Sequence, residues 1–227
     1  MKLKLKKHNE AGVLITFCGL DGCGKTTLIK LLEEVLINEG FDIVLTKQPT
    51  DDVRKSEIFR TYMDRENHDK FDYRALSLLA ASDRVQHSNK FIKPILQDGG
   101  VVISDRYFYS CLANLRARGY TSDKWIYDIA KEIPTPDIAF FLDVEVETAI
   151  GRVRQREAEK NKWIDIPLQY RLREEYINIC RDIGGILLDS SGSDVDQVFK
   201  EVYSNVVKYM KNNKDKNNCI EKVAAYG

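Results

Sequence analysis

The sequence predicts an α/β fold, with a five-stranded parallel sheet and helices on both faces. Short apolar runs alternate with longer amphipathic segments along most of the 227 residues, which is typical of a parallel sheet whose crossovers are helices. The runs are rich in β-branched and aromatic residues, as expected for strands buried on both faces. No linker rich in Gly, Ser or Pro interrupts the alternation, so we expect one domain over 1–227 with its core at about 13–208.

Each predicted element follows from its own pattern. The expected strands are 13–18 (VLITFC), 41–46 (FDIVLT), 101–104 (VVIS), 138–142 (IAFFL) and a fifth beginning at 185–188. The expected helices are 25–39, 51–63, one long helix at 72–97 that Pro94 bends or ends, a helical region up to Pro134, then 146–160, 168–182 and 194–210. The Lys/Asn-rich segment 211–227 is expected to be a frayed polar tail.

Composition excludes several classes of protein. Lys plus Arg number 35 and Asp plus Glu number 35, so no net field favours binding to nucleic acid. The five cysteines are scattered without a CxxC pair, which argues against a zinc site or a disulfide framework. No stretch approaches the ~20 apolar residues of a membrane span, and no signal peptide is evident. These features predict a cytoplasmic protein with no membrane partner.

The strongest motif is GLDGCGKT at 19–26, which matches the phosphate-loop pattern GxxxxGK[ST] between a predicted strand and a predicted helix. Its backbone N–H groups would surround phosphate oxygens at the N-terminus of the helix. Lys25 would reach the β- and γ-phosphates, and the Thr26 hydroxyl would bind Mg²⁺. The sequence therefore predicts ATP and Mg²⁺ as cofactors, bound by Gly19, Asp21, Gly22, Cys23, Gly24, Lys25, Thr26 and Thr27.

A second motif, VVISDRY, ends a predicted buried strand with Asp105 and Arg106. The carboxyl edge of a parallel sheet is where such folds bind ligands. Asp105 can hold Mg²⁺ or its waters there, while Arg106 offers a planar pair of donors to a phosphate. A strand-end ion pair is the alternative, but an intact phosphate loop nearby favours a catalytic role for Asp105.

Three arginines, Arg152, Arg154 and Arg156, alternate along the predicted helix 146–160. Positions four apart share a helix face, so Arg152 and Arg156 are expected to converge. Phosphoryl transfer needs positive charge around the transferred group, and these arginines are therefore candidate catalytic residues. A solvated charged face is the alternative.

Together, FCGLDGCGKTT, LLAASDRVQH, VVISDRYFYS and the arginine-rich helix resemble the thymidylate kinase family over about 13–208. The resemblance implies a P-loop kinase fold, ATP–Mg²⁺ as donor, a nucleoside monophosphate as acceptor, and a homodimer. The leading function is thus phosphorylation of a nucleoside monophosphate, with dTMP to dTDP as the first candidate. The loop carries Gly22 where some members carry an arginine, so a mobile lid over 146–165 should supply the catalytic cations.

The resemblance also implies roles for acceptor-side residues. Asp21 would contact the acceptor sugar, Arg106 its phosphate and Arg84 its base. The same comparison places Lys47, Ala80, Tyr107 and Ser110 at the acceptor.

Departures from the family pattern gather on the acceptor side. The family's Thr-Arg-Glu-Pro is Thr-Lys47-Gln48-Pro here, which loses a planar arginine fork. The aromatic residue expected one turn before Arg84 is Ala80, and the aromatic–Gln pair after Ser110-x-x-Ala113 is Asn114-Leu115. The use of ATP is therefore better supported than thymidylate as acceptor, although Phe108 or Tyr109 could cover the base instead.

Two other functions stay open. A P-loop kinase with a different acceptor, another nucleotide or a small metabolite, keeps the donor site; a hydroxyl acceptor would need Asp105 or Asp21 as a base. A nucleotide-binding switch is less favoured, because the NKxD-like segments at 161–165 and 213–215 place the acidic residue one position late and one early.

Overall fold

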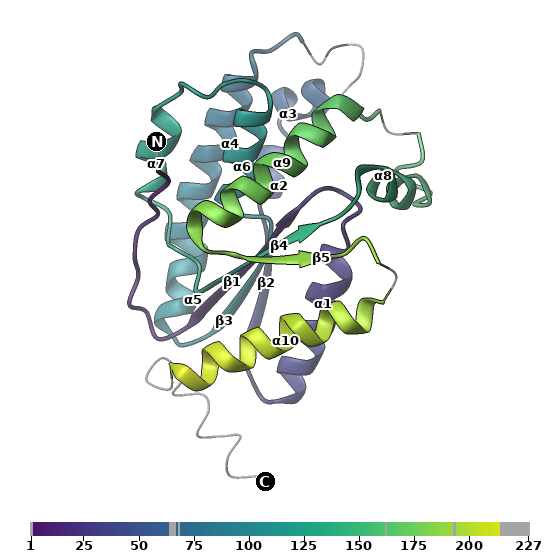
Figure 1. The fold of residues 1–227 in the computed structure, drawn as a ribbon. Helices are drawn as coiled ribbons and strands as arrows, with labels where there is room; N and C mark the ends of the chain where they lie inside the picture. The colour runs from purple at the N-terminus through teal and green to yellow at the C-terminus, as the bar shows by residue number, and fades with distance from the viewer. Residues whose placement is uncertain (1, 64–66, 68, 162, 193, 214–227) are drawn as a thin grey trace.

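The computed structural model describes residues 2–63, 67, 69–161, 163–192 and 194–213. Within these residues the sheet has five parallel strands in the order β2-β3-β1-β4-β5, as predicted (Figure 1). The strands are β1 (Val13–Gly19), β2 (Ile43–Lys47), β3 (Val101–Asp105), β4 (Ile138–Asp143) and β5 (Ile186–Asp189). The α/β fold class and the strand positions are therefore confirmed to within two residues at most ends.

The described helices follow the predicted alternation, with several shorter than expected. They are α1 (Lys25–Asn38), α2 (Asp51–Arg54), α3 (Glu57–Met63), α4 (Tyr73–His87), the π-helical turn η1 (Ser88–Ile92), α5 (Lys93–Gln97), α6 (Phe108–Ala117), α7 (Trp125–Ala130), α8 (Val146–Arg154), α9 (Ile166–Ile183) and α10 (Val195–Asn212). The predicted tail begins inside α10, and 214–227 lie outside the described residues.

Three predicted helices differ from the structure for local reasons. The segment 51–63 is two helices, because the Ser56 hydroxyl bonds the Val53 carbonyl and accepts from the Phe59 N–H. The segment 72–97 changes to a π-helical turn just before Pro94, which has no N–H to donate. Helix α8 ends at Arg154 instead of 160; its buried residues stop at Val153, and packing is what stabilises a short helix.

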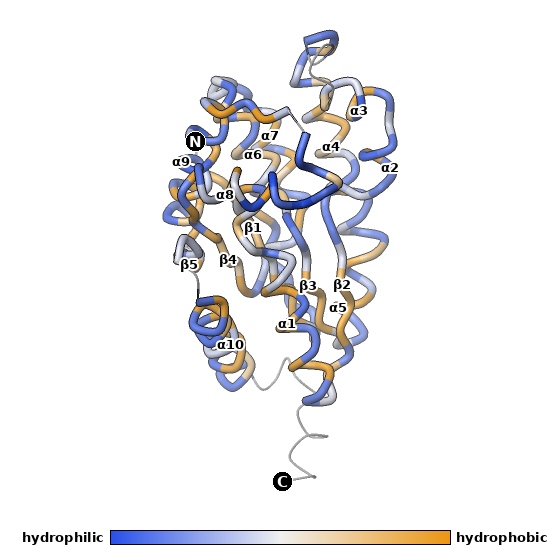
Figure 2. The backbone as a smooth tube through the Cα atoms, turned by 90° about the vertical axis from the view of Figure 1, so that its right-hand side faces the viewer, coloured by the Kyte–Doolittle hydropathy of each residue, from blue (hydrophilic) through white to orange (hydrophobic). Residues whose placement is uncertain are grey.

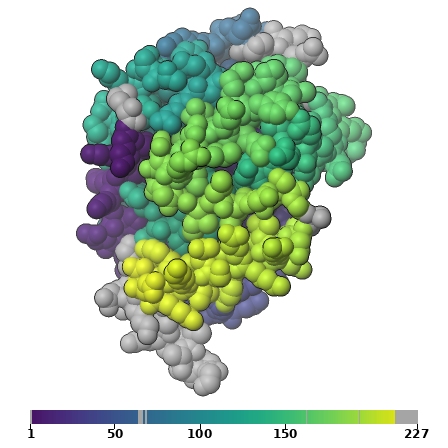
Figure 3. Space-filling model, viewed as in Figure 1, coloured from purple at the N-terminus to yellow at the C-terminus, as the bar shows by residue number. Residues whose placement is uncertain are grey.

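Helices cover both faces of the sheet, as the alternation predicted. Helices α1 and α10 pack on one face, while α4, α6 and α9 lie on the other (Figure 1). Figure 2 shows blue and orange residues alternating around α10, and its buried residues Val202, Val206 and Met210 recur every four residues. Helices α9 and α10 form much of the face seen in Figure 3. The buried apolar residues make one core cluster around the strands.

Strand register brings the polar strand ends to one edge. Phe17 of β1 and Lys47 of β2 both pair with Asp105 at the end of β3. The phosphate-loop segment leaves β1 two residues later and leads directly into α1. The carboxyl edge of the sheet therefore carries both predicted motifs.

Candidate functional site

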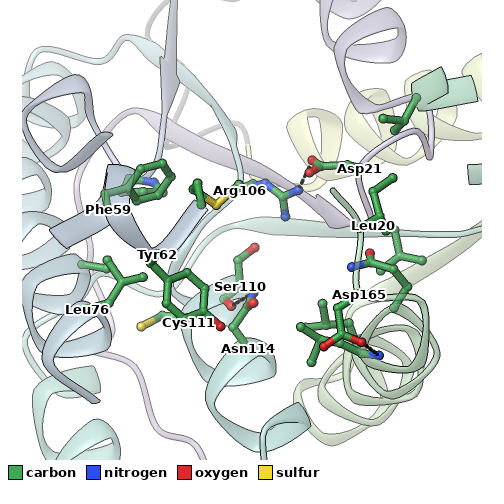
Figure 4. A pocket seen from close by; sticks show the side chains of 18 of the residues that line it. Leu20, Asp21, Phe59, Tyr62, Leu76, Arg106, Ser110, Cys111, Asn114 and Asp165 are labelled. Carbon is green, nitrogen blue, oxygen red and sulfur yellow. Dashed lines mark hydrogen bonds and ion pairs between the residues drawn. The ribbon is translucent and has the colours of Figure 1, made fainter. Parts of the chain in front are cut away.

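One cavity of about 920 Å³ runs along the carboxyl edge of the sheet. One end is lined by the phosphate loop and the start of α1, including Gly22, Lys25 and Thr26. The other end lies between α4 and α6 and is lined by residues including Arg84 and Ser110. Figure 4 shows this second half, with Arg106 and Asp21 joined across the middle. The cavity thus connects the phosphate loop with Arg84 and Ser110, two of the residues for which the sequence predicts a place at the acceptor.

The phosphate loop has the backbone geometry its glycines allow. Gly22 and Gly24 have φ of 86° and 96°, which side chains other than glycine rarely adopt. Their N–H groups have no hydrogen-bond partner within the described part of the chain. A Cβ on Gly22 would lie 2.2 Å from the Ala149 carbonyl oxygen of α8. The loop therefore offers free donors to an anion and packs tightly against the helix that carries the arginines.

Lys25 is buried inside this loop. Its ammonium group donates to the carbonyls of Leu20, at 2.7 Å, and Gly19, at 3.2 Å, and contacts Cys23 Sγ at 3.4 Å. Cys23 is fully buried and does not line the cavity. Thr26 is exposed at the first turn of α1 and lines the cavity, whereas Gly19 and Thr27 do not. The lysine holds the carbonyls of the loop, and its charge lies beside the backbone N–H groups of the loop.

Asp105 has the features of a ligand for a hard cation. It lines the cavity at the end of β3, and its Oδ1 is buried with no hydrogen-bond partner within the described residues. An unpaired buried carboxylate oxygen is costly, and Mg²⁺ binds one or two carboxylates together with substrate phosphates. No group of three metal-binding side chains exists among the described residues. Thr26 and Asp105 therefore fit a Mg²⁺ that nucleotide phosphates would help to hold.

Arg106 is fixed between the two halves of the cavity. Its φ is +68°, an unusual backbone conformation for a residue with a side chain. Its guanidinium donates to the Gly19 carbonyl at 3.1 Å, to the Tyr176 hydroxyl at 2.9 Å and to Asp21 Oδ1 at 2.6 Å. Burial lowers the pKa of Arg106, but Tyr176, Asp21 and Asp105 outweigh it and hold that pKa well above the usual value. The group is a permanent, oriented cation.

Ser110 and its neighbours continue this network. The Tyr176 hydroxyl of α9 donates to Ser110 Oγ at 3.0 Å, and Ser110 Oγ in turn donates to Cys18 Sγ at 3.9 Å. Burial raises the pKa of the Cys18 thiol to about 11, so Cys18 is an inert packing residue. Ser110 lines the cavity, and its role beside the acceptor stays a prediction.

Lys47 is joined at the cavity wall by an arginine that the sequence analysis did not single out. Arg54 of α2 donates to the Pro49 carbonyl at 2.8 Å and lines the cavity. Burial, followed by the charge of Arg106, lowers the pKa of Arg54. Burial and then the charge of Arg54 lower the pKa of Lys47. Both pKa values are lowered first by burial and second by a neighbouring cation, so an anionic ligand would favour the charged forms of Lys47 and Arg54.

Arg84 and Ala80 lie one turn apart on α4, and both line the cavity, as predicted. Arg84 is only 2% exposed. Its Nη1 donates to the Ala80 carbonyl at 2.8 Å, while its Nε is buried without a partner in the described structure. A buried arginine with an unused donor suits a polar ligand atom at this position.

Two expectations for the acceptor end are wrong. Tyr107 does not reach the cavity; it is fully buried, and its hydroxyl donates to the Pro134 carbonyl at 2.7 Å. Tyr107 precedes α6 in an extended backbone conformation, and its ring is buried in the core. Phe108 and Tyr109 are buried and do not line this cavity either. Neither can replace an aromatic ring at Ala80.

The arginines of the expected lid do not act as one cluster. The predicted convergence of Arg152 and Arg156 is wrong, because α8 ends between them. Arg152 donates to the Ser190 carbonyl at 3.0 Å and to the Gly22 carbonyl at 3.4 Å. Arg154 is exposed and bonds the Lys160 carbonyl, away from the cavity. Arg156 lines the cavity and pairs with Glu159 at 2.9 Å.

The acidic residue of the NKxD-like segment 161–165 has a structural role as a helix cap. Asp165 Oδ1 accepts from the Leu168 N–H at 3.0 Å and caps the N-terminus of α9. Residue 162 and the segment from 214 onward lie outside the described residues. Among the described residues, no helix has the length and apolar character needed to cross a membrane.

Comparison with known proteins agrees with this geometry. The profile of the family described as thymidylate kinase matches residues 17–202. A probable thymidylate kinase of Thermococcus kodakarensis is 36% identical over 195 residues, which are 84% of this chain and 95% of that protein. The thymidylate kinase of Caldanaerobacter subterraneus is 34% identical over 205 residues, 88% of this chain and 97% of the relative. The chain belongs to the thymidylate kinase family.

Proposed function

We propose that this chain transfers the γ-phosphoryl group of ATP to dTMP, giving ADP and dTDP. The observation that carries the proposal is the continuous cavity, which joins a phosphate loop at one end to the buried, ligand-facing Arg84 at the other. Membership of the thymidylate kinase family supports dTMP as the acceptor.

The reaction needs positioning and positive charge more than a general base. The attacking oxygen belongs to the acceptor's monoester phosphate, which is mostly ionised at pH 7 because its second pKa is about 6. Arg106, which is held by Asp21 and Tyr176, would bind that phosphate together with Lys47 and Arg54, which line the same cavity. Lys25 would turn from the loop carbonyls to the donor phosphates, and Arg156 would screen the transferred group.

Bound Mg²⁺ would screen the phosphate charges and orient the donor. Thr26 and Asp105 would hold it, since one supplies an exposed hydroxyl and the other an unpaired buried oxygen. The segment 146–165 would act as a lid, with Arg156 as its cavity-facing cation. Asp21, which accepts a hydrogen bond from Arg106, would contact the acceptor sugar.

The proposal includes a homodimer in the cytoplasm. Exposed apolar side chains on neighbouring elements support self-association: Leu45 on β2, Leu78 on α4 and Phe91 on η1. The Thr46–His87 hydrogen bond at 2.7 Å ties β2 to α4, so these elements form one wall. Sedimentation at micromolar concentration tests the dimer, and Leu78→Glu, which places a charge on this wall, should yield the monomer.

The activity is tested by incubating the protein with ATP and Mg²⁺ and each nucleoside monophosphate in turn, while ADP release is recorded. The highest kcat/KM should belong to dTMP, and Lys25→Met should slow ADP release by a factor on the order of 10³. A different preferred acceptor would contradict the thymidylate assignment. Tight guanine-nucleotide binding without any transfer would instead identify a switch.

A further inference from the structure

The acceptor half of the cavity extends beyond Arg84 between two facing helices. On α4, the cavity is lined by Tyr73, Leu76, Ala80 and Arg84; on α6 and its C-terminal end, it is lined by Ser110, Cys111, Asn114 and Arg118. Arg118 stacks on Tyr73, so the end of α6 meets the start of α4. At 1.5 Å per residue, Arg118 lies about 12 Å along α6 from Ser110, which belongs to the Arg106 network.

Arg118 is held there by aromatic faces and hydrogen bonds. Its guanidinium carbon lies 4.0 Å from the ring centroid of Tyr73 and 5.3 Å from that of Tyr62. Its Nε donates to the Tyr62 hydroxyl at 2.6 Å, and its Nη1 donates to both oxygens of Asn114, at 2.8 and 3.0 Å. A guanidinium fixed in this way loses little conformational freedom when it binds a ligand.

The remaining donor of Arg118 is unused. Its Nη2 has no hydrogen bond, and no carboxylate lies within 4.0 Å of the guanidinium, among the residues the structure describes. The neighbouring arginines differ: Arg74 pairs with Asp123 and Arg116 pairs with Glu175. An oriented, half-buried cation with a free donor in a cavity is typical of a ligand-binding group.

We propose that Arg118 is a specificity-determining residue that donates from Nη2 to an oxygen of the acceptor's base. The proposal rests on the function proposed above, because it assumes a nucleoside monophosphate in this half of the cavity. The rings of Tyr62 and Tyr73, whose centroids lie 5.1 Å apart, both line the cavity and would supply the aromatic surface that Ala80 lacks. Asn114, which accepts two hydrogen bonds from Arg118, then acts as a positioning residue for this arginine. This role would explain why Asn114 departs from the family pattern.

The test compares Arg118→Met with a matched control, Arg74→Met. Arg74 stacks on Tyr120 of the same aromatic cluster, at 4.2 Å, but does not line the cavity. Arg118→Met should raise the KM for dTMP at least tenfold and leave the KM for ATP unchanged, whereas Arg74→Met should leave both unchanged. A milder variant, Tyr62→Phe, keeps the ring and removes the hydroxyl; it should raise the KM for dTMP two- to fivefold even if Arg118→Met folds poorly.

Calorimetric titration with thymidine, which lacks the phosphate, locates the contact. Loss of Arg118 should weaken thymidine and dTMP by the same factor. Weakening of dTMP alone would place the contact at the phosphate and overturn the proposal, as would equal effects of Arg118→Met and Arg74→Met. Absence of dTMP turnover in the wild type, with thymidine binding still dependent on Arg118, would contradict the proposed function and leave this inference standing.

Discussion

The two ends of the cavity are built differently. At the donor end, the phosphate loop offers groups from consecutive residues of one backbone segment. At the acceptor end, the groups are side chains from β2, α2, α4 and α6. The donor end depends on positive φ at Gly22 and Gly24 and on the buried Lys25. The acceptor end depends on pairs such as Arg118 and Tyr62, which are 56 residues apart. A site made by one backbone segment tolerates few changes, while a site made of separate side chains can exchange them one at a time. The positions that depart from the family pattern, Lys47, Ala80 and Asn114, all lie in the part of the cavity that is made of separate side chains.

The largest expected effect lies at the donor end. Lys25→Met should lower kcat by a factor on the order of 10³, because it removes the cation beside the phosphate cradle. The carbonyls of Gly19 and Leu20 also lose a buried donor, at a cost of about 1–3 kcal/mol of unfolding free energy. ADP release and thermal unfolding with and without ATP measure the two effects. A folded Lys25→Met protein with normal turnover would contradict the phosphate-loop assignment.

The arginines after β4 should differ in their effect on kcat, depending on whether they line the cavity. Arg156→Met should lower kcat by roughly 10²-fold with little change in the KM for ATP, because its contact would form mainly in the closed complex. Arg154→Met is the matched control, since Arg154 points away from the cavity, and it should keep full kcat. Steady-state kinetics of both variants measure this difference. Equal kcat values would show that the proposed role of Arg156 in the lid is wrong.

A smaller effect is expected where the acceptor end departs from the family. Ala80→Phe should lower the KM for dTMP by about fivefold, since ring stacking contributes about 1 kcal/mol beyond buried area. The KM for ATP should not change, because Ala80 lies at the other end of the cavity. If Ala80→Phe abolishes turnover, the natural acceptor fills the space beside Ala80 and is larger than dTMP. If no acceptor's KM changes, Ala80 does not contact the acceptor.

The smallest expected effect concerns pH and the wall beside the acceptor end. Burial lowers the pKa of His87, and Asp83 only partly opposes this. The unfolded chain therefore binds the proton more readily, and stability falls as the pH drops through about 6.5, the ordinary histidine value. Between pH 7.5 and 5.5, His87→Gln should lose about 1–2 °C less in Tm than the wild type. Equal losses in scanning calorimetry would show that His87 titrates as it does in the unfolded chain.

The sequence predicted the strand, turn and helix around the phosphate loop, although Gly19, Cys23 and Thr27 do not line the cavity. Gly19 to Thr26 form a contiguous motif, so strand, turn and helix signals all agree. Arg84 and Ala80 came from a family resemblance, and their shared face follows from helix geometry. Arg54, Arg118 and Tyr62 were missed because tertiary contacts alone bring them to the cavity. The predicted convergence of Arg152 and Arg156 was wrong because the arginines continue to alternate along the sequence beyond the end of α8. The buried residues that stabilise this helix stop at Val153.

The close packing of Gly22 against α8 restricts how this lineage can change. A Cβ at this position would overlap the Ala149 carbonyl, and the φ of +86° disfavours any side chain. An arginine at position 22 therefore requires α8 to shift in the same step. A side chain at position 22 and the present position of α8 exclude each other, so a change at Gly22 is linked to a change in the packing of α8.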